Sequence, residues 1–214
     1  MNFKKTFTLC GLLVMMNTTI WAARFDLFFP HLMKAEGLYF VIIQYDKGGA
    51  TKFGITLYTY LMWCNQTKVV WIGCDKDKNG VLNANDLRVT TLNDVRPIYQ
   101  KQYWDTYHLS EVDNQAIAEI TSDLIVNCGP GVKNKHIKAI QTYLKLKPDG
   151  VMGTKTIEKI NKTNANRLYH FIYQYREKHY LKIGVGKQKK FLKGWLNRIS
   201  TLKQIHKHEN YINL

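Results

Sequence analysis

Two carboxylates and a threonine lie close together in the stretch KAEGLYFVIIQYDKGGATKFGIT near the start of the chain. Glu36 falls at the end of a predicted helix, where the helix dipole and burial under Tyr39 and Phe40 would favour a protonated carboxyl. Asp46 lies in a polar loop, where water and hydrogen bonds favour the ionised form. One protonated and one ionised carboxylate is the pair that glycoside hydrolysis uses, and Thr51 could position a water beside Asp46.

Small and aromatic residues could complete a sugar site around these acids. Gly48 and Gly49 would let the backbone approach a sugar closely, and Tyr103 and Trp104 could stack on a sugar face. Each feature also has a structural explanation, because acids at this spacing are common on surfaces and aromatic residues at helical spacing usually pack in a core. Asp123 could support the site from a buried helix or bond to a neighbouring turn. The spacing alone therefore leaves catalysis open.

The pattern of apolar residues predicts a mainly α-helical protein with a small β element. In the first helix, Pro30 is expected in the first turn and Gly37 at the C-terminal cap. Strand signals are few, and a division of the chain is expected near residues 126–131. The expected elements are a helix within 25–37, a short extended piece leading into a helix within 51–63, and helices within 92–107, 114–129, 134–146, 154–180 and 191–200.

The N-terminal segment and the net charge of the chain indicate export. Residues 1–23 have a basic start, a short apolar run and small residues at Ala22 and Ala23, which is the layout of a signal peptide. Without Lys4 and Lys5 the net charge of +15 becomes +13. A basic exported protein suits an anionic cell wall, and export argues against nucleic acid as the partner. We expect a monomer without a stable membrane insertion once the signal is removed.

The blocks AEGLY and YDKGGATKFGITLYTY resemble the opening of glycoside hydrolase family 108, the bacterial and phage N-acetylmuramidases, which read E-G-G-Y, D-P-G-G and G-I-T. The resemblance continues in order through IYQKQYWD, QAIAEITSDLIVNCG, AIQTYLKLKPDGVMGTKT and FLKGWLNRI, and the later blocks resemble the peptidoglycan-binding half of this family. It implies a lysozyme-like fold and Glu36 as the general acid. Two positions differ: Leu38 replaces the second glycine and could narrow the site, and Lys47 replaces the proline.

This resemblance implies residues 24–125 as a lysozyme-like catalytic domain and 126–214 as a peptidoglycan-binding helical region. The predicted activity is hydrolysis of the β-1,4 bond between N-acetylmuramic acid and N-acetylglucosamine in peptidoglycan. The alternatives are a wall-binding protein without activity, a lytic transglycosylase that also uses a glutamate, and a basic nucleic-acid binder, which export disfavours.

An acidic segment, DKDKNGVLNAND at 75–86, fits the EF-hand-like calcium-loop pattern. Oxygen side chains fall at positions 1, 3 and 5, glycine at 6 and a carboxylate at 12, and the pattern predicts a structural Ca²⁺ and no organic cofactor. A shorter aspartate stands at position 12, where glutamate is usual, so bidentate closure is open. The segment could otherwise be a surface turn. The expected ligands are Asp75, Asp77, Asn79, Val81, Asn83 and Asp86.

The remaining cysteines and histidines show no pattern of ligands. Cys64 and Cys74 flank an apolar segment and could pair in an oxidising compartment, which would leave Cys128 unpaired. The sequence predicts no transition-metal site among the seven histidines.

Overall fold

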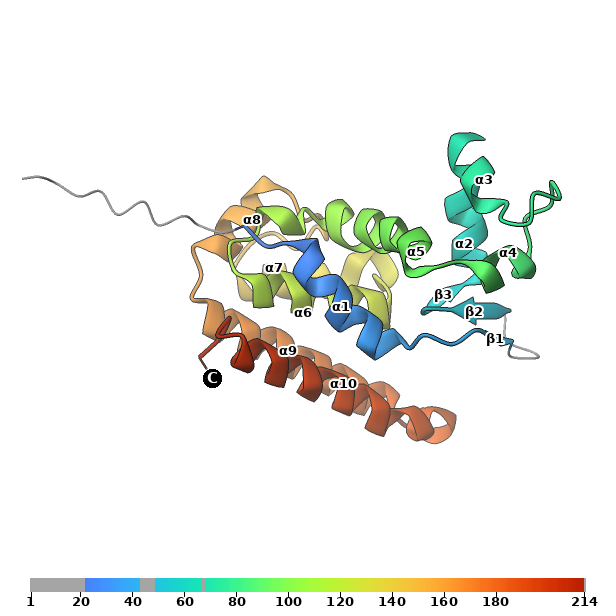
Figure 1. The fold of residues 1–214 in the computed structure, drawn as a ribbon. Helices are drawn as coiled ribbons and strands as arrows, with labels where there is room; N and C mark the ends of the chain where they lie inside the picture. The colour runs from blue at the N-terminus through green and yellow to red at the C-terminus, as the bar shows by residue number, and fades with distance from the viewer. Residues whose placement is uncertain (1–21, 43–48, 67, 214) are drawn as a thin grey trace, which may run out of the picture.

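The computed structural model describes residues 22–42, 49–66 and 68–213, and the predicted signal peptide lies almost wholly outside them. Within this part of the chain the protein is mainly α-helical with one small sheet, as predicted (Figure 1). No helix in these ranges is long and apolar enough to cross a membrane. The α-helices are α1 (Phe25–Glu36), α2 (Leu57–Cys64), α3 (Lys68–Cys74), α4 (Ala84–Val89), α5 (Leu92–Tyr99), α6 (Gln115–Cys128), α7 (Lys135–Tyr143), α8 (Thr154–Asn161), α9 (Ala165–Ile183) and α10 (Lys189–His208).

Helix α1 carries Glu36 at its C-terminal end. Its apolar face is buried and its last turn closes at Gly37, whose N–H donates to the carbonyl of Met33 at 3.2 Å with φ at +81°. Glycine adopts this left-handed conformation at little cost, so the predicted cap is confirmed. The predicted position of Pro30 in the first turn is wrong, because α1 starts five residues earlier. Pro30 lies on the exposed side of the helix.

A small antiparallel sheet follows α1 in the order β1 (Val41–Ile42), β2 (Ala50–Lys52) and β3 (Ile55–Thr56). Phe53 and Gly54 connect β2 to β3, both with positive φ, which is the geometry of a tight hairpin turn. Thr56 then caps α2, since its hydroxyl accepts from the N–H of Thr59 at 3.2 Å. The predicted extended piece that leads into a helix is therefore present.

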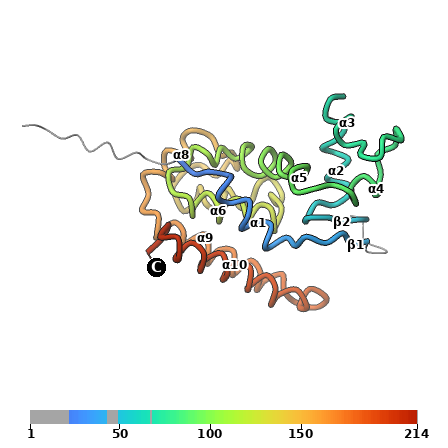
Figure 2. The backbone as a smooth tube through the Cα atoms, viewed as in Figure 1, coloured from blue at the N-terminus to red at the C-terminus, as the bar shows by residue number. Residues whose placement is uncertain are grey.

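Helix α6 runs through the middle of the molecule, and the long pair α9 and α10 lies beneath it and α1 (Figures 1 and 2). One hydrophobic cluster includes residues on both sides of the predicted division at 125/126, among them Phe28 of α1, Leu124 of α6 and Ile172 of α9. The predicted single helix over 154–180 is two helices, because the chain turns at 162–164 and Asn164 caps α9.

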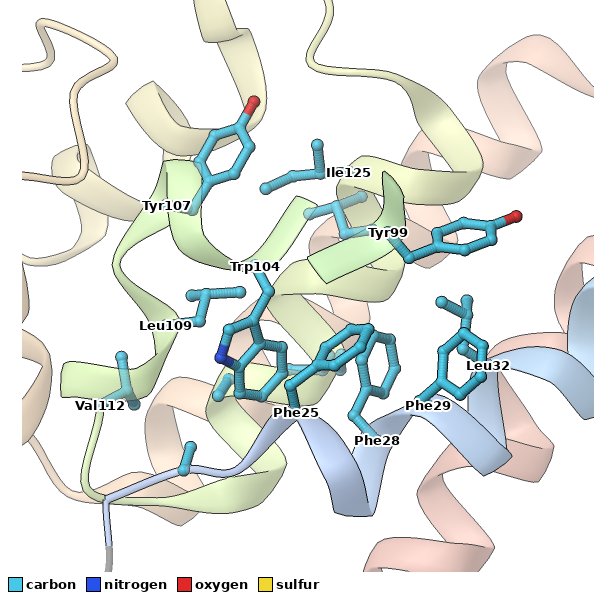
Figure 3. Close-up of a cluster of buried hydrophobic side chains, with 14 of the residues drawn as sticks. Phe25, Phe28, Phe29, Leu32, Tyr99, Trp104, Tyr107, Leu109, Val112 and Ile125 are labelled. Atoms are coloured by element: carbon cyan, nitrogen blue, oxygen red, sulfur yellow. The ribbon is translucent and has the colours of Figure 1, made fainter. Parts of the chain in front are cut away.

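Trp104 belongs to this core and does not face a sugar. It is fully buried, its ring stacks on Phe28 at 5.6 Å between centroids, and it meets Phe25 edge-on at 5.7 Å (Figure 3). Its indole N–H donates to the hydroxyl of Ser110 at 2.7 Å. The predicted role of Trp104 in substrate binding is therefore wrong, because no face of the ring is open to a ligand.

A disulfide links the two short helices that lie between the sheet and the acidic loop. Cys64 at the end of α2 and Cys74 at the end of α3 form a disulfide, and Cys128 is free. The sequence left this pairing open. Neither α3 nor α4 was predicted, because both are short and α3 lacks an apolar periodicity of helical length.

Candidate active site

Glu36 lies where α1 meets the sheet and α10. Its side chain is 15% exposed, and Oε1 accepts a hydrogen bond from Nη2 of Arg198 at 2.6 Å. The cover expected from Tyr39 is absent, because this side chain is 85% exposed. The aromatic neighbours of Glu36 are Tyr99 and Tyr103: burial raises the pKa of both hydroxyls, and the charge of Glu36 adds to that shift.

The turn between β2 and β3 lies against the second oxygen of Glu36. A Cβ atom at Gly54 would be 2.4 Å from Oε2 of Glu36 and 2.6 Å from the hydroxyl of Tyr99, so only glycine fits there. Tyr99 donates from its hydroxyl to the carbonyl of Phe53 at 2.8 Å, which fixes this turn to α5. The β element therefore positions backbone beside the carboxyl.

Arg198 is the centre of a charged network. Besides Glu36 it binds Asp123 of α6, with Nη2 to Oδ1 at 2.7 Å and Nε to each carboxylate oxygen at 3.1 Å. Arg176 of α9 approaches Oδ2 of Asp123 at 2.6 Å as an ion pair. Burial opposes the charge of Asp123, but the two arginines outweigh it and lower the pKa of Asp123 to about 2.

Arg198 is the site residue that the sequence did not reveal. It lies 162 positions after Glu36 and near the end of the block FLKGWLNRI, which the resemblance linked to the peptidoglycan-binding half and not to the acid site. The available signal was an arginine beside the apolar residues Leu196 and Ile199 of a predicted helix. Asp123, for which two roles were open, contacts the site through Arg198 and not a neighbouring turn.

The other predicted site residues fall into three groups: those outside the described residues, those in or next to the sheet, and Tyr103. Asp46 and Gly48 lie outside the described residues. Thr51 lies in β2, in register with Val41 and Thr56, and Gly49 faces open space with φ at +66°. Tyr103 is half-buried against Tyr99, at 5.7 Å between ring centroids, so Glu36 and Tyr103 are the predicted pair that the described structure brings together.

A pocket of about 230 Å³ opens next to this network, between α1 and α10. Lys34, Asp123, Asn197 and Arg198 contribute polar groups to its wall. Glu36 is not among the lining residues, so the pocket adjoins the carboxyl and is not centred on it. Leu38, which could have narrowed the site, is 54% exposed.

The acidic loop between α3 and α4 turns its carboxylates toward each other, with oxygens of Asp75, Asp77 and Asp86 within 4.8 Å. Asp75 accepts from the N–H of Gly80 at 3.0 Å, and the carboxylate of Asp86 accepts from the N–H groups of Lys76 at 2.8 Å and Asn83 at 2.9 Å. These bonds join the first position of the loop to the sixth, and the last position to the second and the ninth.

Comparison with known proteins gives two family matches along the chain. Residues 29–129 match the family described as "Glycosyl hydrolase 108", and residues 135–200 match the family described as "Predicted Peptidoglycan domain". No curated protein matches the chain. The solved structure of SagA from Brucella abortus is similar, with 28% identity and a TM-score of 0.64 over 85% of this chain and 92% of that chain. Arg198 falls in the second matched range and Glu36 in the first.

Proposed function

We propose that the protein hydrolyses the β-1,4 bond between N-acetylmuramic acid and N-acetylglucosamine with Glu36 as general acid, because residues 29–129 match the glycosyl hydrolase 108 family and residues 135–200 match a peptidoglycan domain. The observation that carries this proposal is the placement of Glu36. Its carboxyl is half-buried at a helix end, one oxygen is held by Arg198, and the other faces the glycine turn of the sheet.

The reaction requires Glu36 to protonate the oxygen of the leaving sugar. In the free protein Oε1 is paired with Arg198, and Oε2 lies against the turn at Gly54. For Glu36 to act as the acid, the bound glycan strand would displace Arg198 from Oε1 and exclude water, because a carboxyl in a dry site without a charged partner favours the neutral form. Arg198 would then retain Asp123 as its partner.

Asp46 and Thr51 are proposed to act on the other side of the sugar. The carboxylate of Asp46 would stabilise positive charge at the sugar carbon or activate a water, and Thr51 would orient that water. Tyr103 would contact the sugar with its partly exposed ring. The helices after residue 129 would hold the glycan strand or its peptide stems, in agreement with the peptidoglycan match, and such a substrate implies a protein exported to the periplasm or beyond.

The test is digestion of purified peptidoglycan by the wild type and by Glu36→Gln, with mass analysis of the products. Glutamine keeps the shape of the side chain but carries no acidic proton, so turnover should fall by about 10²–10⁴-fold while sedimentation with the wall persists. Glu158→Gln is the matched control, since Glu158 is exposed on α8. New reducing ends indicate hydrolysis, whereas anhydro-sugar ends would identify a transglycosylase. Equal rates for wild type and Glu36→Gln would exclude this role, and wall binding without release by either would indicate a binding protein.

We also propose a structural Ca²⁺ in the acidic loop. Its donors are hard oxygens, which suit Ca²⁺, and the ion would neutralise carboxylates that now lie near one another. Calorimetric titration should show one Ca²⁺ bound per chain and a higher melting temperature. Asp77→Asn, which changes an exposed ligand, should weaken binding, and an absence of both heat and thermal shift in the wild type would refute the proposal.

A further inference from the structure

Three potential ligands for a soft metal ion meet where α6, α7 and α9 come together. Cys128 ends α6, His136 lies in the first turn of α7, and His179 lies in the last turns of α9. Their sulfur and nitrogen atoms all lie within 4.8 Å of one another. The sequence predicted no histidine ligand pattern because these positions are 8 and 43 residues apart, and only the fold brings them together.

The ring of His136 is buried, and one of its nitrogens has no partner among the described residues. The residue is 0% exposed, and its Nδ1 bonds to the hydroxyl of Tyr175 at 3.0 Å. Among the described residues its Nε2 makes no hydrogen bond. A buried polar atom without a partner costs about 1–3 kcal/mol. A hydrogen bond at one ring nitrogen with the other left free is the arrangement of metal-binding histidines.

The chemistry of the cluster suits a thiophilic transition metal. Burial lowers the pKa of His136 to about 4, with a further contribution from Lys135, and burial also lowers the pKa of His179. Both imidazoles are therefore neutral near pH 7 and have a lone pair to donate. Burial raises the pKa of the Cys128 thiol, which would release its proton when an ion binds. One thiolate and two imidazoles favour zinc over calcium or magnesium.

We propose that Cys128, His136 and His179 form a Zn²⁺ site with water as the fourth ligand. Tetrahedral zinc would bring the three donor atoms to about 3.5 Å from one another. The side chains of Cys128 and His179 are partly exposed, so their rotation would shorten the donor-to-donor distances from within 4.8 Å to this value. A pocket of about 310 Å³ lined by His179 and Tyr175 gives access from solvent.

Three lysines, Lys135, Lys178 and Lys182, also line this pocket, and their positive charge opposes the approach of a free cation. The ion would join the end of α6 to α7 and α9, and thus the two matched ranges of the chain. Its role is to fix these helices, so the site is independent of the proposed glycosidase reaction.

The experiment uses the full chain, freed of metal and saturated with Ca²⁺ so that the acidic loop does not compete. Zn²⁺ titration should give one ion per chain and a higher melting temperature, and Co²⁺ should give a thiolate-to-metal absorption band. Cys128→Ser should abolish that band. Both Cys128→Ser and His179→Ala should weaken Zn²⁺ binding at least as much as the roughly 10–100-fold seen when an outer-shell partner is lost.

His170→Ala is the matched control, because His170 is an exposed histidine of the same helix, and it should bind Zn²⁺ like the wild type. Both test positions are partly exposed, and circular dichroism of the variants checks their fold. The proposal is overturned if the wild type binds no Zn²⁺, if the Co²⁺ form lacks the thiolate band, or if folded Cys128→Ser and His179→Ala bind as tightly as the control.

Discussion

Helix α6 carries two buried carboxylates one turn apart, Asp123 and Glu119, and both connect α6 to α1 and α10. In the Asp123 layer, formed by Asp123, Arg176, Arg198 and Glu36, the partners are arginines. Arginine stays charged at every pH at which the protein is folded. This layer ends at a carboxyl that is 15% exposed, so its last member is open to a ligand.

In the Glu119 layer, formed by Glu119, His31, His206 and Gln115, the partners are histidines and an amide. Glu119 is fully buried and accepts from Gln115 at 2.7 Å, while its second oxygen lies 3.1 Å from His31 and 2.9 Å from His206. Both oxygens of Glu119 have a partner within the layer, and His31 also pairs through Nε2 with the carboxylate of Glu209 at 3.2 Å. Both layers are built from a buried carboxylate of α6 and side chains of the neighbouring helices, but they differ in what they do. The Glu119 layer holds helices together, whereas the Asp123 layer also positions Glu36.

The largest effect should come from removal of the charge at the centre of the Asp123 layer. Asp123→Asn leaves Arg176, which is 0% exposed, without its counter-ion. Loss of one partner of a buried ion pair costs about 3–5 kcal/mol, and we expect that decrease in the free energy of unfolding by urea. Asp113→Asn, at an exposed position, is the control. A loss below about 1 kcal/mol would mean that Arg176 does not depend on Asp123.

A smaller effect, on activity, should follow from Arg198→Lys. Lysine keeps the charge but lacks the planar fork that binds both oxygens of Asp123 and Glu36 at once. A misplaced Glu36 should lower kcat by roughly 10–100-fold with KM little changed, as small errors in position do. Arg167→Lys, on the exposed side of α9, should leave kcat unchanged. If KM rises and kcat does not change, Arg198 binds substrate and does not position Glu36.

The sequence indicates the local part of this arrangement. The helix that ends at Glu36, its glycine cap and the short extended piece before α2 depend on neighbouring residues, so the sequence pattern reveals them. The resemblance of ordered blocks adds the family and the role expected of Glu36. Pro30 was misplaced because local rules set its preferred position in a helix but not where the helix begins.

The long-range part could not be predicted from one sequence. The contact between Glu36 and Arg198 joins residues 162 positions apart, and the cluster at His136 joins three helices. Such contacts depend on how helices pack, which hydrophobic periodicity does not specify. Trp104 was ambiguous for the same reason, since an aromatic residue on a helix is core or surface according to what covers it.

The smallest effect concerns the pH dependence of the Glu119 layer. The hydrogen bond to Glu119 raises the pKa of His31 above 6.5, against the opposing effect of burial. A raised pKa means that the protonated histidine stabilises the folded state below pH 6.5, and that this contribution is lost as pH rises through the folded-state pKa. His31→Gln removes the titration but keeps a hydrogen-bonding side chain. The excess stability of the wild type over His31→Gln should therefore be largest at pH 5.5 and shrink toward pH 8, as measured by urea unfolding at each pH.

Between pH 5.5 and pH 8 the stability contributed by His31 should change, whereas the contributions of Glu119 and Asp123 as carboxylates should not. Burial opposes the charge of Glu119, but its bonds to His206 and His31 outweigh it and lower its pKa below 4.5, so Glu119 stays ionised throughout the range. Asp123 does not titrate there either, because its pKa is about 2. Asp123→Asn should consequently cost the same at pH 5.5 and at pH 8. A difference between wild type and His31→Gln that is constant or grows with pH would show that His31 is held neutral, and the Glu119 layer would then be as insensitive to pH as the Asp123 layer.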